Sequence, residues 1–181
     1  MISPKATRPQ QGRVALLREE GHQDFEVEAV TIASPNLLTF QVVTGEECYF
    51  VMGAYTPPAD TKGVDDLRVA WAACPTNCKP LLLGDLNIDF RAPRTEREEI
   101  IVDFLDKINV IDTSRKYIQR KGCRQGRGAW WTWWQQRGGR WYQSQPDYIM
   151  AREEDTKAFR NVAFWRPRIH NSDHCTVIAR I

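Results

Sequence analysis

The alternation of apolar and polar positions predicts a series of short elements in the first half of the chain. Apolar and acidic residues alternate over 25–30, which is typical of a strand with one face in water. Residues 37–43 and 48–55 resemble paired strands, and the polar segment 44–47 between them predicts a hairpin turn. Apolar residues at helical spacing over 64–73 predict an amphipathic helix.

The second half begins with a helix signature, because Thr95 and Glu98 have the spacing of a capping box. Apolar residues that recur at helical spacing are interpreted as core positions without a function: Ile100, Ile101, Phe104, Leu105 and Ile108. Strands are expected over 110–112, 130–134, 161–165 and 175–181, with a hairpin turn over 137–140. This order predicts a mixed α/β (α+β) domain over 12–181, preceded by a flexible leader over 1–11.

Residues 81–87 form the central motif of the chain. Three consecutive leucines after Pro80 predict a short strand buried on both faces, which Gly84 ends. Asp85 and Asn87 follow, and residues i and i+2 of an extended segment point to the same side. A carboxylate beside a carboxamide suits a metal-bound water and a phosphoryl oxygen. A plain turn is the alternative, since Gly, Asp and Asn are common turn residues.

Basic residues are concentrated in one segment, although the net charge of the 181-residue chain is only +2. No acidic residue lies between Asp112 and Asp147. The loop expected over 116–128 is interpreted as a segment that contacts a nucleic-acid backbone, with a solvated loop as the alternative. The candidate contact residues are Arg120, Lys121, Arg124, Arg127 and, further along the chain, Arg137.

The tryptophan-rich segment 130–134 has two interpretations. Alternate side chains of a strand face opposite sides, so one set of tryptophans would fill the core. The other set would lie near nucleic acid, where indole rings stack on bases while arginines meet phosphates. We favour this mixed account and take Trp133 as a candidate nucleic-acid contact.

Composition restricts the class of protein. Apolar residues make up 42% and charged residues 27% of the chain, an ordinary globular balance. Five scattered cysteines argue against a disulfide framework and for a reducing, intracellular compartment, with the nucleus as one candidate location. Cys74 and Cys78 are interpreted as incidental. No apolar run has the length of a membrane span, and the first dozen residues lack the apolar core of a signal peptide.

Two later segments also put acidic residues at strand ends: 144–150 contains Asp147, and 171–175 contains Asp173 and His174. With Gly-Asp-Leu-Asn at 84–87 and the tyrosine-containing segment 54–58, they form four motifs. In this order the motifs resemble the endonuclease/exonuclease/phosphatase superfamily. That superfamily includes apurinic/apyrimidinic (AP) endonucleases, deoxyribonuclease I and the endonuclease domains of non-LTR retrotransposons, and the retrotransposon branch is the most similar. The resemblance implies a four-layer αββα sandwich.

The resemblance also implies roles for the strand-end residues. Asp85 would orient or deprotonate the attacking water, and Asn87 would hold that water or the phosphate. Asp173 would lie at a metal centre that holds Mg²⁺ or Mn²⁺.

The remaining roles belong to residues around the scissile phosphate. His174 would contact the phosphate, while Asp147 would hold the other ring nitrogen and fix the tautomer. Tyr55 would donate a hydrogen bond to the phosphate. The alternatives are a packed aromatic at Tyr55 and a structural turn residue at Asp147.

The superfamily normally has two further strands before the strand expected here over 13–17, ending in an asparagine and a metal-binding glutamate. The first asparagine of this chain is Asn36 and the first glutamate is Glu19, so neither stands where the motif needs it. We therefore expect a domain that is incomplete at its N-terminus. Weakened metal binding and an unpaired sheet edge would follow.

Two functions from different classes stand as hypotheses. One is a metal-dependent DNA endonuclease of the retrotransposon type, with DNA as partner, no membrane or small-molecule cofactor, and an origin in a reverse-transcriptase polyprotein. Its activity would be low or absent without the missing glutamate. The other is a non-catalytic nucleic-acid-binding remnant. A phosphatase of the same fold is less favoured, because the basic, tryptophan-rich segment suits a polymeric nucleic acid.

Overall fold

The computed structural model of the chain describes residues 26–59, 61–90, 95–115, 131–165 and 172–181. The chain divides into two compact units, one up to Leu86 and the other from Asn87 onward. The leader expected over 1–11, the strand over 13–17 and the basic loop over 116–128 lie outside the described residues. Among the residues that are described, no helix is long and apolar enough to cross a membrane.

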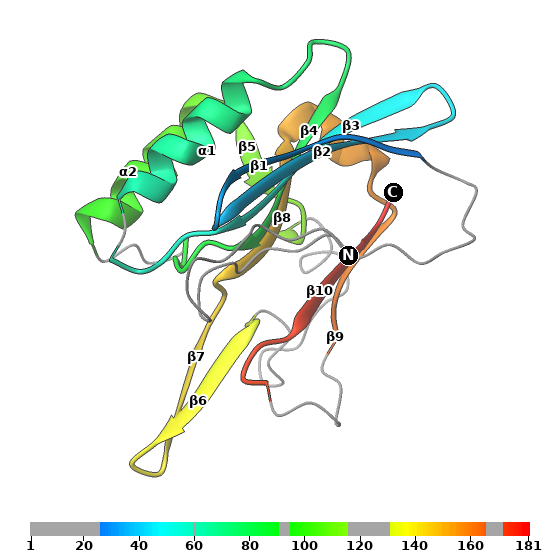
Figure 1. The fold of residues 1–181 in the computed structure, drawn as a ribbon. Helices are drawn as coiled ribbons and strands as arrows, with labels where there is room; N and C mark the ends of the chain where they lie inside the picture. The colour runs from blue at the N-terminus through cyan, green and yellow to red at the C-terminus, as the bar shows by residue number, and fades with distance from the viewer. Residues whose placement is uncertain (1–25, 60, 91–94, 116–130, 166–171) are drawn as a thin grey trace. The chain divides into compact units, whose positions relative to one another are not determined.

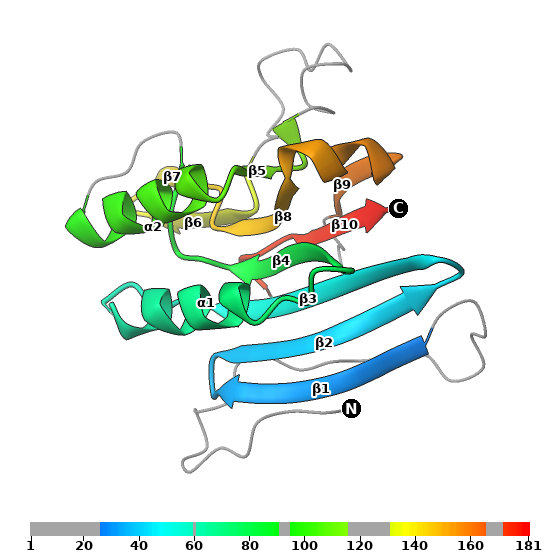
Figure 2. The ribbon, with the colours of Figure 1, turned by 90° about the horizontal axis from the view of Figure 1, so that it is seen from above.

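The first unit is a sheet in which β1 (Glu26–Ser34), β2 (Leu37–Thr44), β3 (Glu47–Tyr55) and β4 (Lys79–Asp85) lie side by side in chain order (Figure 2). β1, β2 and β3 pair antiparallel, whereas β3 and β4 pair parallel. The predicted hairpin is confirmed, and its turn contains Gly45 at a φ of 58°.

Helix α1 (Lys62–Ala72) forms the crossover between the parallel strands β3 and β4, as a parallel pair requires. It buries Val64, Leu67 and Ala70, which recur at helical spacing, and it packs on the sheet against β1, β2 and β3. The amphipathic helix predicted over 64–73 is therefore confirmed, with its first turn two residues earlier.

Cys48 and Cys78 form a disulfide within the first unit, with their sulfurs 2.01 Å apart. Cys48 lies in β3, and Cys78 directly precedes β4. The interpretation of Cys78 as incidental is wrong, because parallel pairing of β3 and β4 brings together two residues that are 30 apart in sequence. That proximity follows from strand order, which cysteine spacing does not reveal.

The second unit contains helix α2 (Glu96–Lys107), which begins with the predicted capping box. The Thr95 hydroxyl accepts the Glu98 N–H at 3.2 Å, and the Glu98 carboxylate accepts the Thr95 N–H at 2.9 Å. The helix buries Ile101 and Leu105. Behind it, β5 (Val110–Asp112) pairs antiparallel with β8 (Asp147–Arg152), and the short helix η1 (Glu153–Ala158) follows.

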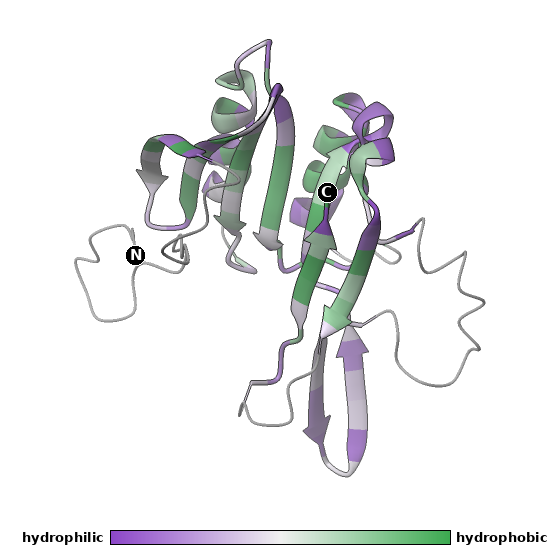
Figure 3. Ribbon diagram, turned by 90° about the vertical axis from the view of Figure 1, so that its right-hand side faces the viewer, coloured by the Kyte–Doolittle hydropathy of each residue, from purple (hydrophilic) through white to green (hydrophobic). Residues whose placement is uncertain are grey.

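A hairpin of β6 (Trp133–Arg137) and β7 (Arg140–Ser144) also belongs to the second unit (yellow in Figure 1). The strand predicted over 130–134 is wrong in its bounds. A two-residue turn at Gly138 and Gly139, with φ of 55° and 76°, fixes the register and places the first paired residue at Trp133. Figure 3 colours this hairpin purple and pale, so it is polar compared with the green strands.

The last strands, β9 (Asn161–Trp165) and β10 (Thr176–Arg180), pair antiparallel and confirm the strands expected near the C-terminus. Their side chains alternate in exposure: Val162 is buried, whereas Trp165 and Ile178 are about half exposed, at 54% and 47%. β10 begins at Thr176, two residues after His174, so the strand lies next to the Asp173–His174 motif in the chain.

Candidate active site

The centre of the candidate site is a hydrogen-bonded pair at the start of β8. The carboxylate Oδ2 of Asp147 lies 2.8 Å from Nδ1 of His174. The Asp147 side chain is 18% exposed and the His174 side chain is 33% exposed, so the pair is shielded but reachable. Because the carboxylate holds the ring at Nδ1, it fixes the orientation of the ring, and Nε2 is the other nitrogen that can donate or accept a hydrogen bond. The structure thus joins the two residues that the sequence expected to act together.

Thr132 holds the backbone around this pair. Its side chain is fully buried, and its hydroxyl accepts the Asp147 N–H at 3.1 Å. Its own N–H donates to the Ser144 carbonyl at 3.0 Å, and its carbonyl accepts the Cys175 N–H at 2.6 Å. One residue therefore connects the end of β7, the start of β8 and the residue after His174. The sequence reasoning missed Thr132, although a lone polar residue within a tryptophan run was a signal.

A second set of hydrogen bonds, among the buried residues Asp112, Ser114 and Gln145, supports the connection between β7 and β8. The Asp112 carboxylate accepts the Ser114 N–H at 2.9 Å, the Ser114 hydroxyl at 2.7 Å and the Gln145 amide at 3.0 Å. All three residues are buried, and neutral donors satisfy the carboxylate in place of a cation. Gln145 stands two residues before Asp147, so the network fixes the chain entering β8.

Asp173 lies beside Trp133, which the sequence had assigned to a separate role. The indole N–H of Trp133 donates to Oδ2 of Asp173 at 2.9 Å. The turn that carries Asp173 is closed by the Ser172 hydroxyl, which accepts the His174 N–H at 3.0 Å. Within the part of the chain that the structure describes, Asp173 forms no ion pair. An exposed carboxylate whose one oxygen is held by a neutral donor is oriented by it, and such an oxygen ligand fits a hard divalent cation.

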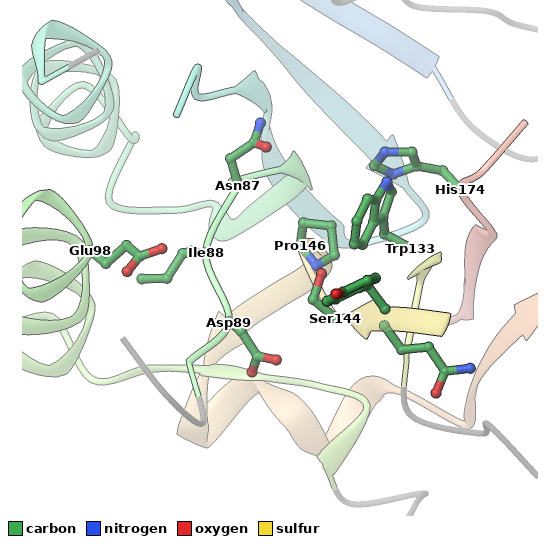
Figure 4. Close-up of a pocket in the computed structure, with 10 residues that line it drawn as sticks. Asn87, Ile88, Asp89, Glu98, Trp133, Ser144, Pro146 and His174 are labelled. Atoms are coloured by element: carbon green, nitrogen blue, oxygen red, sulfur yellow. The ribbon is translucent and has the colours of Figure 1, made fainter. Parts of the chain in front are cut away.

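A cavity of about 410 Å³ opens beside the pair (Figure 4). The close-up draws the rings of Trp133 and His174 next to each other, with Asn87 and Pro146 also on the lining. Carboxylates of Asp89 and Glu98 line the same cavity. The cavity therefore combines hydrogen-bonding, acidic and aromatic groups at one place in the second unit.

Asn87 lines this cavity with a backbone that differs from the one expected. β4 ends at Asp85, and Asn87 has a φ of 50°, so the extended-backbone argument for the pair 85/87 is wrong. Asparagine tolerates this left-handed region better than most residues. The buried Arg97 donates to the Asn87 carbonyl at 3.5 Å, and the Tyr148 hydroxyl donates to the Ile88 carbonyl at 3.1 Å.

In the first unit, Tyr55 and Asp85 stand at neighbouring strand ends. They are register partners in the parallel pairing of β3 and β4, and both are half-buried. The Thr56 N–H donates to the Asp85 carbonyl at 2.9 Å. Gly84 has a φ of 138°, and a Cβ there would lie 1.9 Å from the Ala54 carbonyl oxygen, so only glycine allows this close approach. The predicted placement of Asp85 at the carboxyl end of a strand is thus confirmed.

The other candidate contacts are divided between described and undescribed segments. Arg137 is exposed at the tip of the β6–β7 hairpin, where its side chain bonds Gln135. Arg120, Lys121, Arg124 and Arg127 lie outside the described residues. The proposed roles of all these side chains remain predictions.

No protein-family model and no curated protein matches the sequence. Solved structures do match: the endonuclease domain of TRAS1, a telomere-specific non-LTR retrotransposon, has a TM-score of 0.64 at 16% identity over 89% of this chain and 70% of that chain. An AP endonuclease from Archaeoglobus fulgidus has a TM-score of 0.62 at 15% identity, covering 86% and 71%. The AP endonuclease LMAP from Leishmania major scores 0.56 at 14% identity, and 80% of this chain matches 54% of that one.

These similarities establish the fold class. The chain has the mixed α/β fold of the endonuclease/exonuclease/phosphatase type, so the resemblance found in the sequence motifs is confirmed at the level of the fold. At such low identity the similarity concerns the fold alone, and function has to be argued from the residues of the site.

Proposed function

We propose that the chain is a metal-dependent phosphodiester hydrolase that nicks DNA. The observation that supports this most strongly is the 2.8 Å contact between Asp147 and His174 beside a cavity lined by Asn87. An imidazole held by a carboxylate at one nitrogen is suited, in its protonated form, to donate a hydrogen bond or a proton from the other. The solved structures of the same fold are described as endonucleases, which makes DNA the first substrate to test.

Each residue has a role that its chemistry allows. His174, oriented by Asp147 and in its protonated form, donates from Nε2 to a phosphoryl oxygen and stabilises the charge that develops there. The Asn87 carboxamide holds the phosphate or the attacking water. Asp85 accepts the proton of that water, and the Tyr55 hydroxyl at the adjacent strand end donates to the phosphate. Asp85 and Tyr55 keep these roles as predictions of the resemblance.

Asp173 is the residue of the second unit best suited to hold a cation. Its carboxylate is exposed and takes part in no ion pair among the residues described. A bound Mg²⁺ or Mn²⁺ would neutralise phosphoryl charge and make the water more acidic.

The β6–β7 hairpin favours a polymeric nucleic acid over a small phosphoester. Trp141 is 61% exposed and Tyr142 is 48% exposed, and Arg137 and Arg140 are exposed at the turn. Exposed aromatic rings beside arginines are suited to stack on bases and to contact phosphates. This combination would add nothing to the binding of a single small phosphate ester.

The test is nicking of supercoiled plasmid by the purified chain, with Mg²⁺, with Mn²⁺ and with a chelator. His174→Ala should lower the metal-dependent rate by about 10²-fold or more, because general acid catalysis contributes on that scale. Glu154→Gln is the control, since Glu154 is exposed on η1 and does not line the cavity. The control should nick at the wild-type rate.

Other outcomes would identify the alternatives. Salt-sensitive DNA binding by a folded chain that never nicks would support the non-catalytic remnant. Faster turnover of a small phosphate ester than of DNA would support the phosphatase. Equal nicking by wild type and His174→Ala would mean that the Asp147–His174 pair is not catalytic.

A further inference from the structure

We infer that Trp133 is a positioning residue for Asp173, and that its indole N–H sets the cation affinity of the site. The inference rests on the proposed function, because it assigns Asp173 to the cation. It differs from the role expected for Trp133 from the sequence, in which the ring contacts nucleic acid. The indole has a single donor, and at 2.9 Å that donor is committed to Oδ2 of Asp173.

Backbone pairing around Trp133 and Asp173 supports the bond between their side chains. Trp133 and His174 face each other in an antiparallel bridge. On either side of the bridge, the backbone N–H of Trp134 donates to the Asp173 carbonyl at 3.0 Å, and the backbone N–H of Cys175 donates to the Thr132 carbonyl at 2.6 Å. The two segments are therefore held in register, and this register places the Trp133 side chain within reach of Asp173.

The kind of donor matters for the charge of the site. A lysine or arginine at the same place would add a positive charge beside the carboxylate, whereas an indole orients the carboxylate and adds no charge. One oxygen is occupied by the indole, so the second oxygen is the one that a cation would take. Neutral partners that orient a ligand in this way typically change metal affinity by about 10- to 100-fold when they are removed.

Trp133→Phe is the informative variant, because phenylalanine keeps an aromatic ring for stacking but lacks the N–H. Trp134→Phe is the matched control: Trp134 loses the same group in the same strand, and its ring packs edge-on against Trp131 at 5.0 Å. Circular dichroism and thermal unfolding would be used to check that both variants fold. Mn²⁺ binding to the full chain would be measured by electron paramagnetic resonance, which requires no activity.

The expected result is an Mn²⁺ Kd raised about 10-fold or more by Trp133→Phe and unchanged by Trp134→Phe. Trp133→Ala should match Trp133→Phe in Mn²⁺ affinity. In an Asp173→Asn background, Trp133→Phe should have no further effect, because the two residues act through one contact. The indole N–H resonance that Trp133→Phe removes from the NMR spectrum should shift in Asp173→Asn and on addition of Mg²⁺.

Other results would overturn the inference in distinguishable ways. If Asp173→Asn weakens Mn²⁺ binding but Trp133→Phe does not, the cation role of Asp173 stands and the positioning role of Trp133 fails. If Trp133→Phe resembles wild type while Trp133→Ala weakens DNA binding in chelator, Trp133 is a stacking residue. If the wild-type chain takes up no Mn²⁺, or Asp173→Asn takes it up unchanged, the proposed metal role and the inference fail together.

Discussion

Replacing Thr132 by valine removes a contact that supports the Asp147–His174 pair and leaves both residues of the pair in place. Valine has nearly the shape of threonine, but it lacks the hydroxyl that accepts the Asp147 N–H at 3.1 Å. Because the Thr132 side chain is fully buried, water cannot replace the lost acceptor. A buried donor left without its acceptor costs about 1–3 kcal/mol. For a chain of this size, about 2 kcal/mol lowers the unfolding midpoint by about 4–8 °C.

The same substitution should also lower activity, because the N–H belongs to the residue that orients His174. Small displacements of a positioned catalytic group cost up to about 10²-fold in rate, so we expect kcat for nicking to fall by about 10-fold or more. KM for DNA should stay within about 2-fold, since Thr132 is buried and cannot touch substrate.

Two further variants serve as controls for Thr132→Val. Thr132→Ser keeps the hydroxyl and loses a buried methyl, so it should cost about 1 kcal/mol of stability and leave kcat near wild type. Thr113→Val removes a hydroxyl that donates to the Ile149 carbonyl at 2.7 Å, but that carbonyl also accepts the Thr113 N–H at 3.0 Å. It should therefore cost less than Thr132→Val. Wild-type kcat in a folded Thr132→Val variant, or equal kcat loss in all three, would refute the reasoning.

Three more predictions concern the disulfide, the glycine before Asp85 and the hairpin. Cys48→Ser opens a disulfide that spans 30 residues, so the free energy of unfolding should fall by about 3–4 kcal/mol and the calorimetric midpoint by about 10 °C. Reduction of the wild type with dithiothreitol should have the same effect. An unchanged midpoint would mean that the bond does not form in solution. Gly84→Ala puts a Cβ 1.9 Å from a carbonyl oxygen at a φ of 138°. Chemical denaturation should therefore show a free energy of unfolding that is lower by at least about 2 kcal/mol. A decrease below about 0.5 kcal/mol would contradict the close approach. Arg137→Ala should weaken DNA binding measured in the presence of a chelator. It should also reduce the slope of the logarithm of the binding constant against the logarithm of the salt concentration by about 1. An unchanged slope would mean that Arg137 does not contact a phosphate.

Local signals in the sequence were sufficient for several elements. The capping box at Thr95 and Glu98 formed as predicted, because both of its bonds are made within four residues of chain. The glycine turn at 138–139 and a strand through the three leucines 81–83 were also predicted. In each of these elements the structure follows from backbone preferences and from hydrophobic burial over a few neighbouring residues.

The features that were missed depend on contacts between distant segments. The Cys48–Cys78 disulfide requires β3 and β4 to pair in parallel, and nothing in the cysteine spacing indicates that pairing. The bond between Trp133 and Asp173 joins residues 40 apart. It depends on a hairpin register fixed at 138–139, whereas the tryptophan run alone suggested a strand over 130–134. The φ of 50° at Asn87 likewise contradicts the extended backbone that the sequence predicted for Asp85 and Asn87.

The central claim is that Asp147 and His174 act as one catalytic unit on DNA, and a double-mutant cycle tests it most directly. Magnesium-dependent plasmid nicking would be measured for wild type, Asp147→Asn, His174→Ala and the double variant. If the 2.8 Å contact is catalytic, the double variant should lose no more rate than His174→Ala alone. Additive losses, or nicking by the wild-type chain that does not depend on His174, would contradict the account.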